Sequence, residues 1–359
     1  MTKAKKKKKK FKKMTVPEIV ILVVITVLLL VFVYMLIKPA LRRTQPLGNL
    51  EGVLEKDYSS YELKDENNAD DGLDIDQLIE GQLTVLCLGF DEEGLNTDVM
   101  MLFLFDIKNH SINVLQIPRD SFVNIGQTGK INGVYSVGDP DLTPINRVVS
   151  VVRETFAIPI DRYITINCND IPPVVDLIGG IPIDIPERIV YEADKIIEPG
   201  QQVLNGQQSE WFVRFRHDYA EGDIGRVKAQ RIFLAAAMNK MKDMGASLIT
   251  MLPQLSEYIN SDLTSGELSS LADFATNVEM DDVSVYMVPG EGATYNGYSV
   301  WSIHKDAASE LMNTYFRPYQ KDINSLPVYE LSNTSTWYDN ENANLNDIFE
   351  GDIPDILRN

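Results

Sequence analysis

The stretch that decides the fold is LTVLCLGFDEEGLNTDVMMLFLFDIKNHSINVLQIPRD, residues 83–120. It holds three short apolar runs, at 83–90, 99–107 and 111–118, which are separated by polar segments. Runs of this kind are typical of strands that are buried on both faces of a sheet. The link between the second and third runs is only long enough for a tight turn, which predicts that these two strands pair antiparallel.

Beyond residue 120, segments with helical periodicity alternate with strand-like segments. Helices are predicted at 145–156, 171–180, 224–242, 245–260, 266–277 and 302–315, and strands at 163–168, 181–186 and 283–290. In the first of these helices the apolar residues recur at helical spacing along one face. The alternation predicts an α/β fold in which helices flank a mixed central β-sheet on both sides, an α-β-α sandwich.

The charge of the chain is very unevenly distributed. The formal net charge is −19, yet residues 1–43 hold twelve basic residues and a single acid, so the rest of the chain carries −30. An acidic excess of this size disfavours nucleic acid or an anionic membrane as a partner of the larger part.

The N-terminal region has the pattern of a membrane anchor. Nine lysines precede the run IVILVVITVLLLVFVYMLI, residues 19–37. As a helix this run would span about 28 Å, close to the hydrocarbon thickness of a bilayer. Lys38 and Pro39 follow directly, where a cleaved signal peptide would have a site of small residues. The positive-inside rule places the lysines in the cytoplasm and the remainder outside.

These observations predict a single-pass protein of the cell membrane with its main domain outside the cell. The expected parts are a cytoplasmic polybasic tail (1–18), a transmembrane helix (19–37), an acidic stalk (38–80), an extracellular domain (81–320) and a C-terminal extension (321–359). Outside the cell there is no ATP pool, so a phosphoryl-type reaction there needs a donor that is already activated.

Several common catalytic patterns are absent from the sequence. It contains neither H-E-x-x-H nor G-x-S-x-G, and GQTGK at 126–130 is too short for a phosphate-binding loop. The two cysteines, Cys87 and Cys168, lie in apolar strand-like runs. Two buried thiols are therefore expected, with a disulfide between them as the less favoured alternative.

A cationic cluster stands out in FVRFRHDYAEGDIGRVKAQR, residues 212–231. In an extended segment, Arg214 and Arg216 would point to the same side. Arg226 and Gln230 are four apart and would share a helix face. Arg226 also falls in a first helical turn, which favours anions, so a cation there indicates a bound negative group. The alternative is a solvated face whose arginines pair with the acids nearby.

A second cluster is expected at the ends of the first three strands. Arg119 follows the strand 111–118, Asp91 follows the strand 83–90, and Asp98 precedes the strand between them. If that middle strand is antiparallel to its neighbours, the three side chains converge. Two carboxylates beside a phosphate-binding arginine suit Mg²⁺. For each acid taken singly, a role in a turn or a helix cap is the alternative.

The chain resembles a known family in six ordered motifs. The stretches LCLGFD, TDVMMLFLFD, LQIPRD, GKINGVYSVG, DLIGGIPIDIP and VRFRHDYAEGDIGRVKAQR resemble the LytR-CpsA-Psr family over about residues 83–241. The resemblance implies a phosphotransferase that moves a glycopolymer, such as wall teichoic acid or capsular polysaccharide, from an undecaprenyl pyrophosphate carrier to peptidoglycan. The implied acceptor is the 6-hydroxyl of N-acetylmuramic acid, and the implied lipid site is an apolar tunnel.

The resemblance also implies roles for the upstream cluster. Asp91 and Asp98 match the acids that hold the metal, Mg²⁺ or alternatively Mn²⁺, and Arg119 matches the arginine of the pyrophosphate site. These three are the expected catalytic residues, with Asp98 favoured over Asp91 as the acceptor of the hydroxyl proton. Lys130 and Asn132 match the K-I-N motif and are expected at the pyrophosphate.

The downstream cluster completes the expected site. Arg214, Arg216, Arg226 and Gln230 match the second group of pyrophosphate-binding residues, with Asp223 orienting them. The sequence departs from the family at 96–98, where Asn-Thr-Asp replaces a frequent Arg-Ser-Asp. Two other functions stay open: a phosphohydrolase that cleaves the lipid pyrophosphate with water, and a non-catalytic regulator anchored in the membrane.

Overall fold

The computed structural model describes residues 79, 81–137, 139–215 and 223–331. The predicted tail, transmembrane helix and nearly all of the stalk lie outside these ranges, as does most of the C-terminal extension. Within the described ranges, no helix combines the length and the hydrophobicity that crossing a bilayer requires.

A six-stranded mixed sheet forms the centre of the described chain, in the order β10-β3-β2-β1-β4-β9. Its strands are β1 (Gln82–Phe90), β2 (Thr97–Asp106), β3 (Ser111–Gln116), β4 (Arg162–Asn167), β9 (Ile259–Ser261) and β10 (Val283–Met287). β2 is antiparallel to both β1 and β3, whereas β4 runs parallel to β1. The expected mixed sheet, including the antiparallel middle strand, is therefore confirmed.

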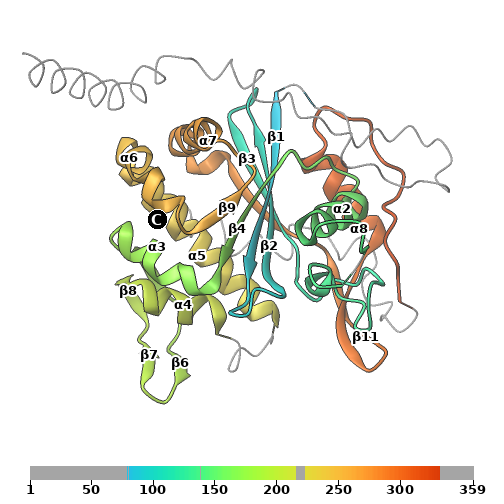
Figure 1. The fold of residues 1–359 in the computed structure, drawn as a ribbon, viewed down its shortest axis with the longest axis horizontal. Coiled ribbons are helices and arrows are strands. Elements are labelled where there is room, and N and C mark those ends of the chain that lie inside the picture. Colours follow the sequence, from blue (N-terminus) through green and yellow to red (C-terminus); the bar gives the residue numbers. More distant parts are fainter. Residues whose placement is uncertain (1–78, 80, 138, 216–222, 332–359) are drawn as a thin grey trace, which may run out of the picture. The chain divides into compact units, whose positions relative to one another are not determined.

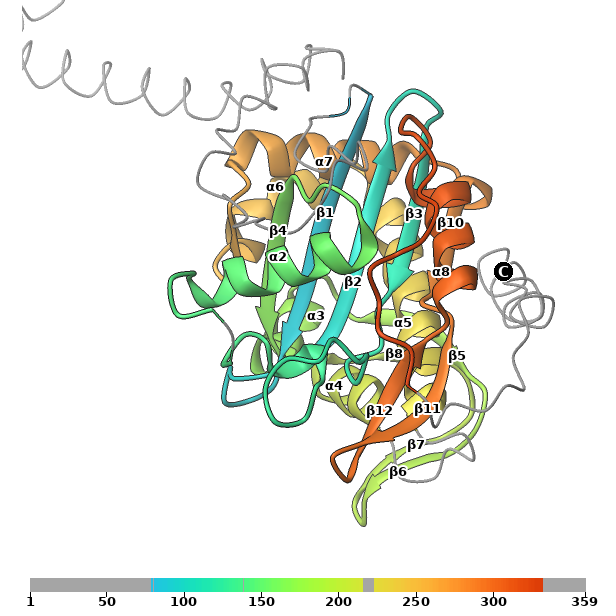
Figure 2. The same ribbon diagram turned by 90° about the vertical axis from the view of Figure 1, so that its right-hand side faces the viewer.

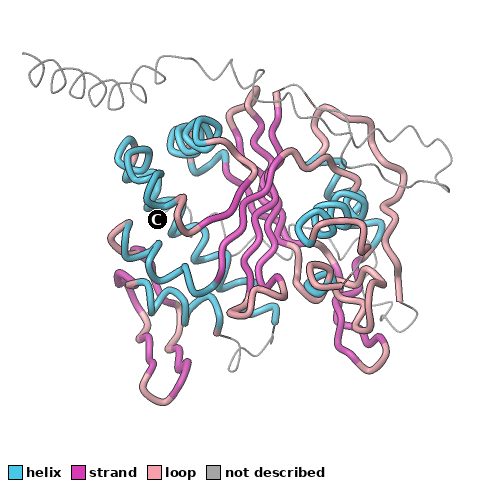
Figure 3. Tube along the Cα trace, viewed as in Figure 1, coloured by secondary structure: helices cyan, strands magenta, loops and turns pink. Residues whose placement is uncertain are grey.

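Helices cover both faces of this sheet (Figures 1 and 3). One face carries α2 (Pro144–Phe156) and α8 (Lys305–Leu311), and Figure 2 shows α2 lying across the strands. The other carries α5 (Asp223–Met244), α6 (Ala246–Leu255) and α7 (Ser265–Asn277). The alternation along β1 explains this arrangement, since Leu86 and Leu88 pack towards α2 while Leu83 and Val85 pack towards α7.

A smaller layer of chain follows β4 and has its own hydrophobic cluster. It consists of α3 (Ile171–Leu177), β5 (Ile181–Ile185), β6 (Ile189–Glu192), β7 (Lys195–Ile197), β8 (Gly200–Leu204) and α4 (Gly206–Arg214). Ile183, Leu204 and Phe212 belong to its core, which Ala229 of α5 joins. At Gly206 a side chain would collide with the carbonyl of Pro172, so glycine is required where α4 packs on α3.

One predicted helix, at 302–315, is wrong in its first part. Residues up to Ile303 belong to β12 (Tyr298–Ile303), which forms a hairpin with β11 (Gly290–Tyr295). The turn between them is Asn296-Gly297, and both residues have positive φ angles. This is the sequence that two-residue hairpin turns favour, and it outweighs the helical pattern of the flanking residues.

Two further boundaries differ from the expected ones. The helix predicted at 245–260 ends at Leu255, because the chain then enters the edge strand β9. Beyond residue 320, Ile323, Leu326 and Val328 are buried in the core that α2 covers. The packed chain therefore continues past the boundary expected there. Both cysteines are free thiols, as expected, but only Cys168 is buried, whereas Cys87 is half-buried.

A buried ion pair joins β4 to α7. Arg162 donates to the carboxylate of Glu267 with a shortest distance of 2.7 Å, and both side chains are less than 10% exposed, at 7% and 6%. Burial raises the pKa of Glu267, but hydrogen bonds from Thr264 and Arg162 outweigh this effect and lower it. A lowered pKa contributes stability above the pKa of the unfolded chain, and this contribution is lost as the pH falls.

We expect Glu267→Gln to lower the free energy of unfolding by roughly 3–5 kcal/mol, because it removes the charged carboxylate from a buried ion pair. Urea unfolding at pH 7, followed by circular dichroism, measures this loss. The difference from the native chain should shrink as the pH falls below about 4. Glu310→Gln, at an exposed position of α8, is the matched control. Equal stabilities of the two variants would contradict the assignment.

Candidate functional site

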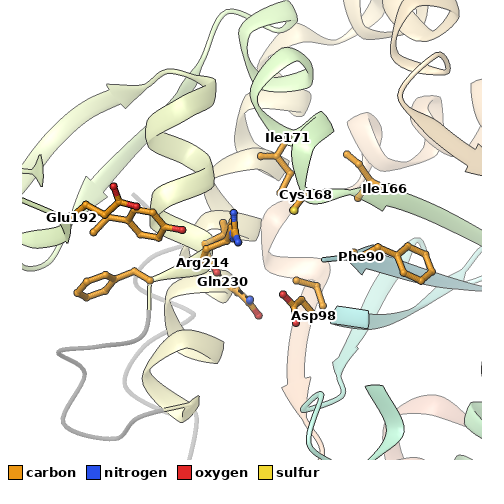
Figure 4. A pocket seen from close by; sticks show the side chains of 13 residues that line it. Phe90, Asp98, Ile166, Cys168, Ile171, Glu192, Arg214 and Gln230 are labelled. Carbon is orange, nitrogen blue, oxygen red and sulfur yellow. Dashed lines mark hydrogen bonds between the residues drawn. The ribbon is translucent and has the colours of Figure 1, made fainter. Parts of the chain in front are cut away.

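A pocket of about 290 Å³ lies where the carboxyl ends of β1 and β4 meet the smaller layer. Strand residues and helix residues from distant parts of the chain surround it (Figure 4). Its lining consists of Gly89, Phe90, Asp98, Val99, Ile166, Cys168, Ile171, Tyr191, Glu192, Val213, Arg214, Phe215 and Gln230. In open α/β sheets this is the usual place for a ligand.

A β-bulge places Asp98 in the pocket. Gly89 pairs with Val99, but Phe90 pairs with Thr97, so Asp98 is one extra residue in β2. In a regular strand, consecutive residues point to opposite faces. At this bulge Asp98 and Val99 both line the pocket. Bulges re-aim side chains in this way, often beside active sites.

Asp98 and Arg119 are brought together, as the antiparallel arrangement predicted. The Nη1 atom of Arg119 lies 2.5 Å from Oδ1 of Asp98, in a half-buried ion pair. Arg119 is not one of the lining residues, so it meets the pocket through Asp98. The pair couples the end of β3 to the bulge of β2.

Lys130 and Asn132 do not line the pocket but contact the segment that carries Arg119. Lys130 Nζ lies 3.1 Å from Asp120, whose carboxylate is also 3.8 Å from Nε of Arg119. The backbone N–H of Asn132 donates to the carbonyl of Arg119. In the structure Lys130 and Asn132 contact the segment 119–120. The pyrophosphate-binding roles expected for them stay predictions.

Asp91 organises the loop between β1 and β2. Its carboxylate accepts hydrogen bonds from the backbone of Leu95 and Asn96 and from the Asn96 side chain. Burial raises the pKa of Asp91, but these bonds outweigh it and lower that pKa. The described geometry thus matches the turn role that was the alternative for this acid. Its metal-binding role stays a prediction.

Arg214 lies in the pocket, but its expected backbone conformation is wrong. It is the last residue of α4, not part of an extended segment, because the capping box of Asn205 and Gln208 starts a helix that runs to it. Its Nη1 atom lies 2.7 Å from carboxylate oxygens of both Glu210 and Glu92. Burial lowers the pKa of Arg214, but these two carboxylates raise it above the usual arginine value.

The helix α5 contributes Gln230, which is buried and donates to the carbonyl of Val213 at 3.2 Å. Its neighbour Arg231, which sequence reasoning missed, reaches the end of β3, where its Nε lies 2.6 Å from the side chain of Gln116. Arg216 and the side chains of Asp223 and Arg226 lie outside the described residues. Their roles stay predictions.

The described charges around the pocket compensate one another. The cations are Arg119, Lys130 and Arg214, and the acids near them are Asp98, Asp120, Glu92 and Glu210. The described part therefore has no excess of positive charge. Nor do three His, Cys, Asp or Glu side chains gather there as a metal-binding group. Asp98 is one of the two carboxylates in the lining, with Glu192, and it can serve a metal whose other ligands come from substrate and water.

Sequence reasoning missed three residues that line the pocket and one, Glu210, that contacts a lining residue. Glu210 stands four residues before Arg214, a spacing that predicts an ion pair once the helix is recognised. Tyr191 and Glu192 arrive on the β6–β7 hairpin. Cys168 follows β4 in a short 3-10 helix (η4, Cys168–Asp170). No local signal marks these three for the pocket, because the packing of the smaller layer on the sheet places them.

Comparisons with known proteins agree with the motifs. A family model described as the LytR_cpsA_psr family matches residues 51–317. The polyisoprenyl-teichoic acid–peptidoglycan teichoic acid transferase TagU of Oceanobacillus iheyensis is 30% identical over 67% of this chain and 77% of its own length. TagV of Bacillus subtilis, which carries the same transferase name, is 31% identical over 45% of this chain and 42% of its own length.

Solved structures show the same fold. The crystal structure of B. subtilis TagV aligns with a TM-score of 0.57 at 22% identity, covering 67% of this chain and 97% of that chain. A structure of TagT bound to LIIa-WTA aligns with a TM-score of 0.54 at 22% identity, covering 67% and 94%. At this identity the likeness concerns the fold.

Cys168 provides a chemical reporter of the pocket. Burial raises the pKa of its thiol, and the nearby Arg214 offsets this only in part. With Cys87 replaced by alanine, we expect iodoacetamide to label Cys168 more slowly than a free thiol at pH 7. The rate should keep rising beyond pH 8.5, the ordinary range for cysteine. Mass spectrometry of labelled protein measures it, with Cys87→Ala/Cys168→Ala as the blank. A rate that levels off below pH 8 would contradict this environment.

Proposed function

Because this chain belongs to the LytR-CpsA-Psr family, we propose that it is a phosphotransferase that moves a polyisoprenyl-linked glycopolymer onto peptidoglycan. A relative that matches 67% of the chain is named as a polyisoprenyl-teichoic acid–peptidoglycan teichoic acid transferase. Wall teichoic acid or a capsular polysaccharide is the proposed polymer, undecaprenyl pyrophosphate the proposed carrier, and the 6-hydroxyl of N-acetylmuramic acid the proposed acceptor.

The proposal rests on the mixed lining of the pocket, which is partly apolar and partly charged. Apolar side chains, including Ile166, Ile171 and Phe215, share it with Asp98 and Arg214. A lipid pyrophosphate has the same two characters, an apolar chain and a charged head. Arginine forks suit phosphate oxygens, and the apolar surroundings strengthen such contacts.

The proposed reaction is an in-line displacement at phosphorus. The sugar hydroxyl oxygen bonds to the phosphorus nearer the polymer, and the bond from this phosphorus to the bridging oxygen breaks. Polyisoprenyl phosphate leaves, and the polymer is joined to peptidoglycan by a phosphodiester. Asp98 accepts the hydroxyl proton once the phosphate draws Arg119 away from it. The enzyme acts mainly by positioning the groups and neutralising charge, as in other phosphoryl transfers.

We also propose that the reaction uses Mg²⁺, with Mn²⁺ as the alternative. Asp91 and Asp98 would hold the ion, since Mg²⁺ in such sites takes one or two carboxylates and completes its shell with substrate phosphates and water. Asp98 would then accept the hydroxyl proton on the carboxylate oxygen that the ion does not take. Bound there, the metal would neutralise phosphate charge. The balance of the described side-chain charges supports this, because it leaves most of the pyrophosphate charge uncompensated.

The proposed location is the outer face of the cell membrane. The basic residues before the apolar run 19–37 support an N-terminus in the cytoplasm. The proposed donor, linked through pyrophosphate, carries its own activated linkage, which suits a compartment without ATP.

A reconstituted transfer reaction tests the proposal. We expect the full chain in detergent, given a lipid-linked teichoic acid precursor, peptidoglycan oligomers and Mg²⁺, to produce a phosphodiester-linked conjugate detectable by mass spectrometry. Chelation with EDTA should stop the reaction and added Mg²⁺ restore it. Release of free phosphorylated polymer without conjugate would indicate the phosphohydrolase instead. Binding of the precursor without turnover would indicate a non-catalytic regulator.

The role of Asp98 has its own test. Asp98→Asn keeps the shape of the side chain but removes its basicity, so kcat should fall by about 10²–10⁴-fold, the usual worth of a general base. Circular dichroism should show an unchanged fold. Asp184→Asn, at an exposed position of β5, is the control and should keep the native rate. A kcat for Asp98→Asn within twofold of the native value would remove Asp98 from the chemistry.

A further inference from the structure

Two carboxylates hold Arg214, and they differ in a way that matters for the ligand. Glu210 stands one helical turn earlier on α4 and is 14% exposed, whereas Glu92 comes from the loop after β1 and is 58% exposed. Both lie 2.7 Å from the same atom, Nη1 of Arg214. An Nη1 group has two N–H bonds, so these two partners take both.

Glu210 is sufficient to position Arg214. It lies on the same helix at the i, i+4 spacing, and its low exposure keeps it in place without help from another element. Glu92 is instead an exposed partner from another part of the chain, and such pairs are weak because water solvates the separated charges well. Of the two contacts, the one with Glu92 is therefore the easier to break.

The backbone that carries Glu92 is held firmly, so only its side chain needs to move. Asn167 donates to the carbonyl of Asp91 at 2.8 Å, and Asn169 donates to the carbonyl of Glu92 at 3.4 Å. The Asp91 carboxylate closes the loop from within. Rotation of the Glu92 side chain into solvent leaves all of these bonds intact.

The charge around Arg214 favours such a release when a phosphate arrives. With both glutamates ionised, Arg214, Glu92 and Glu210 together carry a net charge of −1, which repels an anion. Departure of Glu92 frees one N–H of Nη1 for a phosphate oxygen and removes this negative charge from the contact. The incoming oxygen takes the geometric place of the carboxylate oxygen.

We propose that Glu92 is an affinity-determining residue of this site, an internal anion that occupies Arg214 until the phosphate group of the ligand displaces it. This inference rests on the proposed function, since it requires Arg214 to bind pyrophosphate. Glu92 weakens the binding of any anion that needs the N–H of Arg214 Nη1 to which Glu92 is bonded. It stays paired with Arg214 whenever the pocket holds no such ligand.

The test is the affinity of the full chain, in detergent with Mg²⁺ at about 0.15 M salt, for inorganic pyrophosphate by isothermal titration calorimetry. Glu92→Gln should lower Kd by about two- to fivefold, the range expected when an exposed ion pair no longer competes. Glu93→Gln removes the same charge from the same loop at an exposed position, and should change Kd less than about 1.5-fold because solvent and salt screen it.

The same substitution made in an Arg214→Gln variant shows whether the effect of Glu92 depends on Arg214. Arg214→Gln should weaken pyrophosphate binding, and adding Glu92→Gln to it should give no tightening. Equal Kd values for Glu92→Gln and Glu93→Gln, or weaker binding by Glu92→Gln, would overturn the inference, while native binding would still support the pyrophosphate site of the proposed function. Failure of the native chain to bind pyrophosphate would reject both. Tightening that persists in the Arg214→Gln background would show a general charge effect and also overturn the inference.

Discussion

The pairing of β2 with β1 is the constraint on which the pocket depends. Nine registered pairs hold the two strands together, and the single irregularity between Gly89 and Phe90 leaves Asp98 as an extra residue. Without it, Asp98 and Val99 would point to opposite faces of the sheet. The ion pair with Arg119 then ties β3 to the same point. One extra residue in a strand thus determines which acid faces the ligand.

The charge balance changes how the arginines of this chain are understood. Their concentration within a chain of net charge −19 indicates an anionic ligand. Yet Arg119 and Arg214, the two expected pyrophosphate-binding arginines whose side chains are described, already pair with carboxylates. In such a site the incoming phosphate displaces a carboxylate that already pairs with an arginine, so one anion replaces another. The net gain is then small for a lone charge and larger for a group with several charged oxygens.

The sequence predicts local pattern well and long-range placement poorly. The three strands of residues 83–120, the mixed sheet and the meeting of Asp98 with Arg119 follow from apolar runs and a short turn. Arg214 was placed on an extended segment because the spacing of two arginines was weighed without the capping box that starts α4. Tyr191, Glu192 and Cys168 reach the pocket through packing of the smaller layer, for which no periodicity exists.

The position of Arg214 at the end of α4 also decides what kind of contact the ligand meets. A helix carboxyl terminus carries partial negative charge, which stabilises the guanidinium and disfavours an anion close to the backbone. Binding at this side of the pocket must therefore come from the tip of the side chain. The helix α5 contributes Gln230 to the lining, a neutral amide about two turns after the helix begins at Asp223. The two helices thus offer the pocket different groups, a charged guanidinium from the end of α4 and a neutral amide from α5.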